Sequence, residues 1–169
     1  QGKADQQGLQ KRIGDAEADF IVSGKTGRGI ILNITDRKSR ITFLELITEV
    51  SIENVHLAFQ RIKTRFPELK TTTTDNDILL QRHKELEVLL NIKIYFCDPY
   101  SSWQKGTVEN SNKYVRRDIP KGSNLSKFSN KFGGSGEGRL NRRPLKCLRY
   151  KTPKEVLTES RNTKSTEVL

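Results

Sequence analysis

The sequence predicts an α/β domain built on a mixed central sheet with helices packed on its faces. Three short β segments come first, and β and α segments then alternate, which gives the order β-β-β-α-β-α-β-α. Strands joined by short hairpins pair antiparallel, whereas strands joined through a helix pair parallel, so one sheet would contain both kinds of pairing. With 169 residues the chain has the length of a single domain that can bury a core without disulfides.

The first three strands are short apolar runs at Phe20–Val22, Ile30–Ile34 and Ile41–Leu46. Between them lie the glycine-rich segment Ser23–Gly29 and the polar segment Asp36–Ser39, both typical of turns. Connections this short predict an antiparallel meander.

A helix is predicted next, because Ser51 is a good N-cap and apolar residues after it recur at intervals of three and four until Pro67 ends the pattern. The apolar stripe consists of Ile52, Val55, Phe59, Ile62 and Phe66.

The second half of the sheet is expected to begin with the β-branched run Thr71–Thr74, a strand that leads into Asp75. A helix over Gln81–Leu90 and a buried strand over Lys93–Cys97 follow. The residues of this helix that we expect to face inward are Leu86, Leu89 and Leu90.

Two further helices are predicted near the end of the chain. One runs from about Thr107 to Ile119, where Pro120 stops it. The other begins at Thr152, which is followed by proline at the first helical position and glutamate at the third, the pattern of a capping box. Beyond Thr158 the chain is polar and is expected to fray.

These boundaries divide the chain into residues 1–12, a disordered leader, residues 13–158, a folded core, and residues 159–169, a flexible tail. Within the core, Gly133–Gly136 has the composition of a flexible linker, natural or engineered. The chain contains no methionine, which we interpret as the mark of a fragment or a processed protein.

The basic charge is concentrated in one part of the chain. The formal net charge is +11 and the pI is near 9.8. Residues 104–154 hold 14 basic and 3 acidic residues, so the whole excess lies there. A solvated basic surface would explain such a block, but a nucleic acid is the more natural partner, because lysine and arginine that neutralise phosphates release condensed counterions.

Other features exclude a membrane-spanning or disulfide-based protein. The mean hydropathy is −0.68, no apolar run approaches about 20 residues, and no signal peptide opens the chain. Cys97 and Cys147 make no disulfide framework, which favours a reducing, cytoplasmic setting. With His56 and His83 far apart in sequence, a zinc site is not expected.

Three carboxylates are placed where they could meet. Asp19 adjoins the first strand, Asp75 follows the fourth, and Glu109 lies in the first turns of a later helix. The first and fourth strands of such a sheet can be neighbours, which would bring Asp19 and Asp75 together. Clustered carboxylates stay ionised only with cations between them, and hard oxygen ligands favour Mg²⁺ or Mn²⁺ in two-metal phosphoryl transfer.

Three other acidic residues are candidates for the same region. Asp15 also precedes the first strand and competes with Asp19 for the catalytic position. Asp36 is expected to shape the turn between the second and third strands, and Asp98 to cap a loop.

Basic and polar residues near Glu109 are candidates for DNA contacts. Lys113 and Arg117 follow Glu109 by four and eight residues and share or border its helix face. The alternative for Lys113 is a salt bridge that neutralises Glu109. The full set of predicted DNA-binding residues is Lys105, Asn110, Lys113, Arg117, Arg142, Arg143 and Lys146.

Four stretches of the sequence resemble DDE transposases of the retroviral-integrase-like superfamily, and most closely the bacterial insertion-sequence thirty family. The stretches are Gly14–Asp19, Thr35–Arg40, Tyr95–Asn110, and Leu140–Leu148 with Tyr150–Pro153. They span nearly the whole chain, and the third is long and distinctive.

The resemblance implies an RNase H-like fold with a five-stranded mixed sheet, and it implies that Asp19, Asp75 and Glu109 form the DDE triad. The 33 residues between Asp75 and Glu109 match the spacing of the family. The implied chemistry uses two Mg²⁺ or Mn²⁺ ions: water cleaves the phosphodiester at the element end, and the freed 3′-OH attacks target DNA. It further implies a homo-oligomer on DNA in the bacterial nucleoid, and a catalytic core without the region that recognises the terminal repeats.

The sequence departs from the family pattern at three places. Gly133–Gly136 falls where the family has a continuous helix. Ala16 stands where the family has tryptophan, and Asp77 stands where it usually has glycine. The altered loop after Asp75 keeps two alternatives open: a catalytically silent DNA-binding module on the same fold, and a ribonuclease H-like nuclease.

Overall fold

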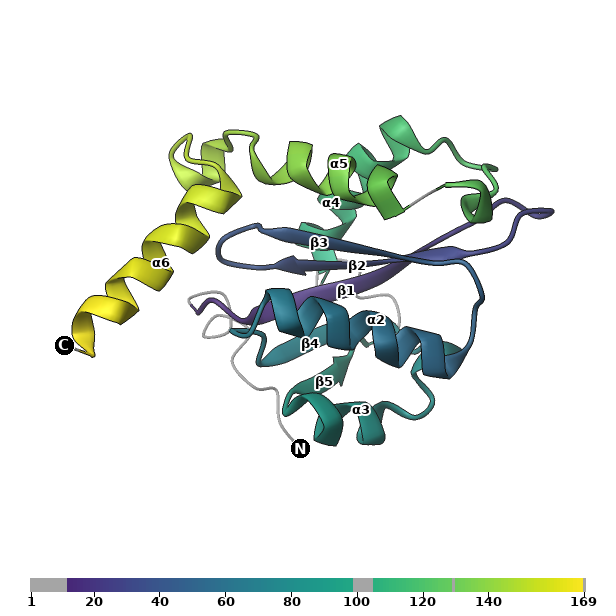
Figure 1. Cartoon of the computed structure of the whole chain (residues 1–169), viewed down its shortest axis with the longest axis horizontal. Helices are drawn as coiled ribbons and strands as arrows, with labels where there is room; N and C mark the ends of the chain where they lie inside the picture. Colours follow the sequence, from purple (N-terminus) through teal and green to yellow (C-terminus); the bar gives the residue numbers. More distant parts are fainter. Residues whose placement is uncertain (1–11, 99–104, 129, 169) are drawn as a thin grey trace.

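In the computed structural model, which describes residues 12–98, 105–128 and 130–168, the chain forms a five-stranded sheet with helices on both faces (Figure 1). The strand order is β3-β2-β1-β4-β5. Their bounds are β1 Asp15–Val22, β2 Ile30–Asp36, β3 Thr42–Ile47, β4 Thr71–Thr74 and β5 Lys93–Phe96.

The pairing confirms the predicted mixed sheet. β1, β2 and β3 form an antiparallel meander, whereas β4 pairs parallel with β1 and β5 pairs parallel with β4. β1 is longer than the sequence predicted, because it begins at Asp15 and not at Phe20. Its first half contains acidic residues and alanines, which have low β-propensity, and only the neighbouring strands make this segment a strand.

The sheet separates two hydrophobic cores, which lie on opposite faces of β2. Leu32 and Ile34 point into the larger core with residues of α2 (Ile52–Arg65) and α3 (His83–Leu90). Ile31 points the other way, into a smaller core with Val115 of α4 (Gly106–Asp118). Every residue of β2 is buried, as expected for a strand covered on both faces.

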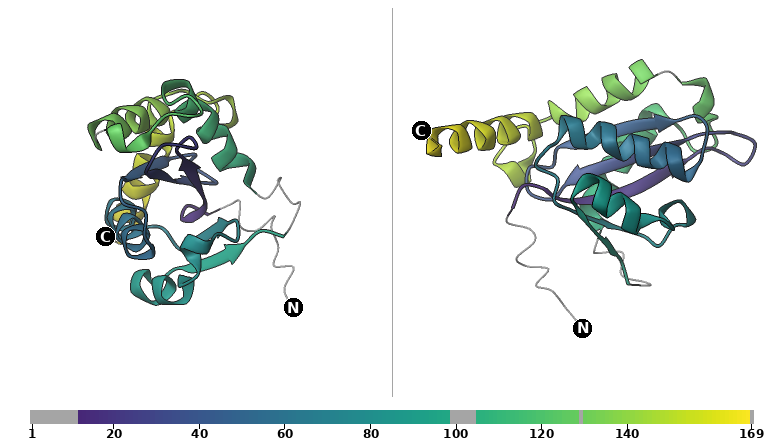
Figure 2. Two further views of the ribbon diagram at one scale, coloured as in Figure 1. Left: turned by 90° about the vertical axis from the view of Figure 1, so that its right-hand side faces the viewer. Right: turned by 60° about the horizontal axis from the view of Figure 1, so that its bottom comes forward.

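The helices form two layers around this sheet. α4 and α5 (Asn130–Asn141) lie over one face, and α2 lies over the other with α3 beside it (Figures 1 and 2). α6 (Pro153–Glu167) points away from the sheet at the C-terminal end. Short 3₁₀ turns at Ile78–Leu80, Leu125–Lys127 and Lys146–Leu148 connect the elements.

Several predicted helix features are confirmed. The Ser51 side chain accepts a hydrogen bond from the Asn54 N–H at the start of α2. At the start of α6, Thr152 and Glu155 form the predicted capping box. α4 ends at Asp118, one residue before the predicted end at Ile119.

Other local predictions are wrong. Leu89 is 54% exposed, because only Leu86 and Leu90, four residues apart, share the inward face of α3. β5 is an edge strand with Ile94 as its buried residue, so Cys97 follows a half-exposed strand rather than ending a buried one.

The C-terminal third is more regular than its composition predicted. α5 passes through Gly133–Gly136 as continuous helix, although glycine is a poor helix former. α6 continues past Thr158 to Glu167, so the expected tail over residues 159–169 is helical through residue 167. Arg161 stabilises this helix against the body of the protein through an ion pair with Glu68. Among the described residues, no helix is long and apolar enough to cross a membrane.

Candidate active site and basic groove

Two of the three predicted catalytic carboxylates lie side by side. In the parallel pairing of β1 and β4, Asp15 is opposite Thr71, so Asp19 and Asp75, each four residues further on, reach the same level of the sheet. A single ammonium group joins them. Lys105 Nζ donates hydrogen bonds to Asp19 Oδ1 at 3.1 Å and to Asp75 Oδ2 at 2.8 Å.

Lys105 is the enclosed member of this trio. Its side chain is 6% exposed, against 28% for Asp19 and 65% for Asp75. Burial alone would lower the pKa of Lys105, but hydrogen bonds and charge interactions with Asp75 and Asp19 outweigh it and raise the pKa. Lys105 is therefore a cation at neutral pH. A contact between Lys105 and a DNA phosphate, as the sequence predicted, requires its ammonium to leave these carboxylates.

Glu109 lies on α4, between two residues of the site along the chain. It follows Lys105, the residue before the helix, by four positions and precedes Asn112 by three, so Glu109 and Asn112 share one face of α4. Both flanking residues contact Asp19. Glu109 itself is exposed, and the described parts of the chain contain no group of three His, Cys, Asp or Glu side chains that could hold a metal ion.

A buried polar network below the site orients Asp19. Asn112 Nδ2 donates to Asp19 Oδ2 at 2.8 Å, and Asn33 Nδ2 on β2 donates to Asn112 Oδ1 at 2.6 Å. Asn33 also donates to the Ser111 hydroxyl. The sequence analysis missed Asn112 and Asn33, although a polar residue three positions after Glu109 was a signal for the former.

Glu17 connects β1 to the start of α4. Its Oε2 accepts a hydrogen bond from the Val108 N–H at 2.8 Å, and its Oε1 forms an ion pair with Arg37. The first N–H groups of a helix lack partners within the helix, and a carboxylate there also interacts favourably with the helix dipole. Glu17 thereby holds the end of α4 that carries Lys105 and Glu109 against the strand that carries Asp19.

Asp15 and Asp36 have structural roles. Asp15 forms an ion pair with Arg12 and accepts a hydrogen bond from the Thr71 hydroxyl. Asp36 accepts hydrogen bonds from the N–H groups of Gly14 and Ser39, which agrees with its expected part in shaping the turn. The role of Asp98 stays a prediction.

A groove of about 340 Å³ runs beside α4, between the β2–β3 turn and the segment after α5. Its lining includes Asn110, Thr107 and Tyr114, and no acidic residue of the described chain lines it. Its basic residues are Arg40, Lys113, Arg117 and Arg143.

Tyr114 lies between two of these cations. The guanidinium carbon of Arg143 is 3.7 Å from the centroid of the Tyr114 ring, and that of Arg117 is 4.5 Å away. Cation–π contacts of this kind hold a guanidinium in place without neutralising its charge. The groove therefore keeps a strongly positive field along the helix of Glu109.

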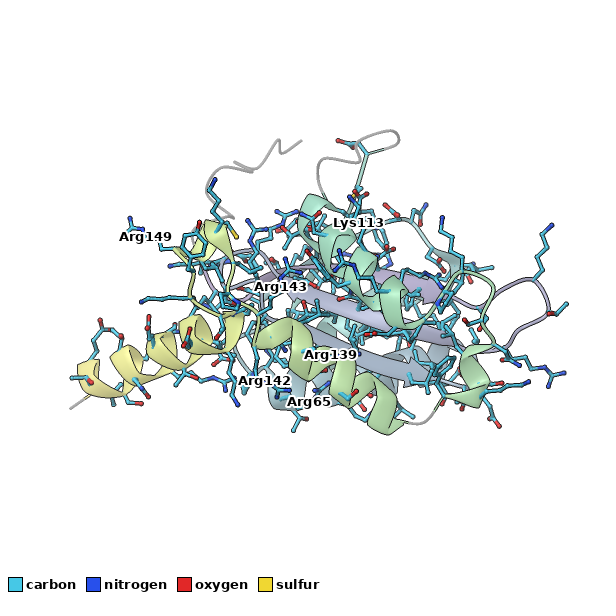
Figure 3. The ribbon with its side chains drawn as sticks, turned by 90° about the horizontal axis from the view of Figure 1, so that it is seen from above. Arg65, Lys113, Arg139, Arg142, Arg143 and Arg149 are labelled. Carbon is cyan, nitrogen blue, oxygen red and sulfur yellow. The ribbon has the colours of Figure 1, made fainter. Side chains whose placement is uncertain are left out.

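The remaining predicted DNA-binding residues lie outside this groove. Arg142 and Lys146 are exposed and do not line it. Figure 3 shows Lys113 and Arg143 toward α4, whereas Arg142 lies toward the opposite side of α5. The structure thus gathers Asn110, Lys113, Arg117 and Arg143, and separates Arg142 and Lys146 from them.

Solved structures define the class of fold to which this arrangement belongs. The catalytic core domain of BIV integrase matches with a TM-score of 0.66 at 19% identity, over 89% of this chain and 97% of that one. A chain of the simian T-cell lymphotropic virus intasome, solved in complex with PP2A regulatory subunit B56 gamma, matches with a TM-score of 0.66 at 14% identity, over 83% of this chain and 52% of that one. The protein has the RNase H-like fold of integrase catalytic cores.

The sequence relatives include insertion-element transposases. The transposase of insertion sequence element IS4351 from Bacteroides fragilis is 39% identical over 158 residues, 93% of this chain and 48% of that protein. The InsI transposase of IS30A from Escherichia coli K12 is 37% identical over 150 residues, 88% of this chain and 39% of that protein.

Over the matched residues the chain is similar to IS30-family insertion-element transposases, as its four motifs predicted. It spans about half the length of the relatives it matches, or less. No protein-family model matches the sequence.

Proposed function

We propose that this chain is the catalytic core of a DNA transposase, which cleaves phosphodiester bonds at element ends and transfers the strand into target DNA. The observation that carries the proposal is the meeting of Asp19 and Asp75 around one cation at the edge of β1 and β4. The family relationship supports the same reaction class.

The carboxylate pair fits a divalent cation. Lys105 Nζ marks a position where a positive charge lies between Asp19 Oδ1 and Asp75 Oδ2, and both are hard oxygen ligands of the kind that Mg²⁺ and Mn²⁺ prefer. Two bound ions would supply an activated oxygen nucleophile and charge stabilisation for the leaving oxygen. We assign Asp19, Asp75 and Glu109 as the residues that hold the ions.

The other residues of the site orient and bind. Asn112 fixes the rotamer of Asp19 through its amide, and Glu17 fixes the position of α4. The DNA backbone lies in the groove along α4, where Asn110, Lys113, Arg117 and Arg143 contact phosphates. We assign the exposed Arg142 and Lys146 to more distant phosphates of the same duplex.

The proposed reaction bears on the oligomeric state of the protein and on where in the cell it acts. Joining two element ends to one target requires two active sites, so we propose that the protein acts as a homo-oligomer on DNA. We place this reaction in the bacterial cytoplasm, at the nucleoid.

Strand transfer by this chain tests the proposal. A labelled duplex that ends in a free 3′-OH is incubated with supercoiled plasmid in Mg²⁺ or Mn²⁺, and joined products are counted. We expect products with the wild type and a loss of about 100-fold or more with Glu109→Gln, because losing a residue that only supports a metal ligand already costs about 10- to 100-fold. Glu53→Gln is the matched control, since Glu53 is an exposed glutamate in the first turn of α2.

The outcomes separate the alternatives. Wild-type protein that binds the duplex without forming joined products in either metal would contradict the transposase proposal and support the silent DNA-binding module. Cleavage confined to the RNA strand of a hybrid duplex would support the ribonuclease H-like nuclease.

A further inference from the structure

Lys105 occupies the central position of the carboxylate pair. Its ammonium lies within hydrogen-bond distance of one oxygen of Asp19 and one oxygen of Asp75. Two carboxylates held this close repel one another unless a cation lies between them. Lys105 therefore stabilises the metal-free arrangement of Asp19 and Asp75.

A divalent ion and the ammonium need the same place. Oxygen ligands of Mg²⁺ lie at about 2.1 Å, and Lys105 Nζ already lies 3.1 Å from Asp19 Oδ1 and 2.8 Å from Asp75 Oδ2, so an ion held by both carboxylates would need the space that the ammonium fills. The repulsion between the two cations, in a position where Lys105 is 6% exposed, adds to the steric conflict. One cation excludes the other.

Lys105 lies at the boundary of α4, and one of its two carboxylate partners is exposed. Lys105 precedes the first residue of α4 and its backbone is not helical, with φ −124° and ψ 26°. Asp75, one of the two partners, is 65% exposed, so the bridge opens toward solvent.

We propose that Lys105 is an internal cation that a divalent metal ion must displace from Asp19 and Asp75. This inference rests on the proposed metal-dependent function. The protein thereby keeps Asp19 and Asp75 together before a metal ion binds. The apparent affinity for the metal is lower than the intrinsic affinity, by the ratio of the bridged to the open population of Lys105.

Manganese titration tests the competition without any DNA. Mn²⁺ binding to the intact chain is measured by calorimetry and by the electron paramagnetic resonance signal of the free ion, for the wild type, Lys105→Gln and Lys105→Met. We expect both variants to bind Mn²⁺ about tenfold more tightly, which corresponds to about 1.4 kcal/mol. Lys164→Gln is the matched control, because Lys164 is an exposed lysine of α6, outside the proposed metal site and the groove. We expect its Mn²⁺ affinity to stay within about twofold of the wild type.

Thermal unfolding provides a second measurement. Without metal, Lys105→Gln leaves Asp19 and Asp75 facing one another with no cation, so its Tm falls below that of the wild type. At a fixed Mn²⁺ concentration, its Tm rises more than that of the wild type, because ligand stabilisation grows as Kd falls.

The inference and the proposed metal site fail in different ways. If Asp19→Asn removes Mn²⁺ binding but both Lys105 variants bind Mn²⁺ as the wild type does, or more weakly, the displacement inference is overturned and the metal site stands. If Asp19→Asn binds Mn²⁺ like the wild type, or if neither the wild type nor the Lys105 variants bind it, the metal site is overturned and the inference with it.

Discussion

Glu17 shows how one buried carboxylate links the fold to the site. It is 3% exposed and joins β1 to α4 through the Val108 N–H and Arg37. Burial raises the pKa of Glu17, although the hydrogen bond from Val108 and the charge of Arg37 act in the opposite direction. The Glu17 carboxyl group therefore stays protonated to a higher pH in the native state than in the unfolded chain.

This raised pKa predicts a pH dependence of stability. A carboxyl group with a raised native pKa contributes its full stability below the unfolded pKa of about 4.5 and loses it as the pH rises through the native pKa. Glutamine at position 17 cannot titrate. We therefore expect the free energy of unfolding of the wild type, minus that of Glu17→Gln, to fall as the pH rises above about 4.5.

Urea unfolding at several pH values from 4 to 8 measures this difference. Subtracting the free energy of unfolding of Glu17→Gln from that of the wild type cancels the titration of other groups. One of these is Asp36, whose pKa is also raised by burial. A difference that stays constant or grows with pH would show that the hydrogen bond and ion pair outweigh burial at Glu17.

At the scale of elements, α5 is a helix that its own sequence opposes. Gly133–Gly136 contains three glycines and one serine, and glycine costs about 1 kcal/mol relative to alanine inside a helix. Contacts with the rest of the molecule compensate. Glu137 accepts a hydrogen bond from the Leu44 N–H of β3, and the Asn141 side chain bonds to both the N–H and the C=O of Thr42.

Alanine at two of these positions should stabilise the protein. Within the part of the chain that the structure describes, no atom beyond the local helix backbone lies within 4 Å of the Cβ position at Gly134 or Gly136, so a methyl group fits at both. We expect Gly134→Ala and Gly136→Ala each to increase the free energy of unfolding by about 0.5–1 kcal/mol.

Chemical denaturation of the two single variants and the double variant measures this gain. The matched control is Gly14→Ala, where φ is +107° and a Cβ would lie 2.0 Å from the Glu68 carbonyl oxygen, so this variant should lose stability. A loss of stability in both α5 variants would contradict the helical assignment of Gly133–Gly136.

At the scale of the whole molecule, part of the net charge of +11 is gathered in one groove. The groove along α4 collects Arg40, Lys113, Arg117 and Arg143 without an acidic residue among its described lining. Other basic residues of the same stretch are neutralised, as Arg139 is by Asp118. The groove, and not the total charge, is the expected phosphate-binding surface.

Salt dependence of DNA binding measures the contribution of the groove. Each phosphate contact adds about 0.9 to the slope of log K against log salt concentration. We expect Arg143→Gln to weaken binding to any duplex and to reduce this slope by about one. Lys164→Gln, which removes an exposed charge on α6, should change neither.

Tyr114→Leu separates charge from positioning in the same groove. It keeps both arginines but removes the ring that holds them, so affinity should fall by about two- to fivefold, as expected for cation–π contacts of 0.5–1 kcal/mol, with the slope unchanged. An unchanged affinity in both Arg143→Gln and Tyr114→Leu would exclude this groove as the DNA-binding surface.

Much of the fold and part of the site could be predicted from local patterns. The turn segments and apolar runs predicted the meander, and the strand Thr71–Thr74 places Asp75 beside Asp19 once β4 pairs with β1. The spacing from Asp75 to Glu109 and the four motifs indicated the transposase family before any contact was known. These features depend on order and spacing along the chain, which the sequence contains directly.

Only the tertiary structure decided which side chains meet. The bridge of Lys105 to Asp19 joins residues 86 positions apart, and the bond from Asn112 to Asp19 joins residues 93 apart. The stacking of Arg143 on Tyr114 depends on how α5 and its following turn pack against α4. Such contacts depend on the docking of one element on another, to which every packed residue contributes. A local pattern therefore predicts an acidic site and a basic helix, and the packing decides that a lysine bridges Asp19 and Asp75.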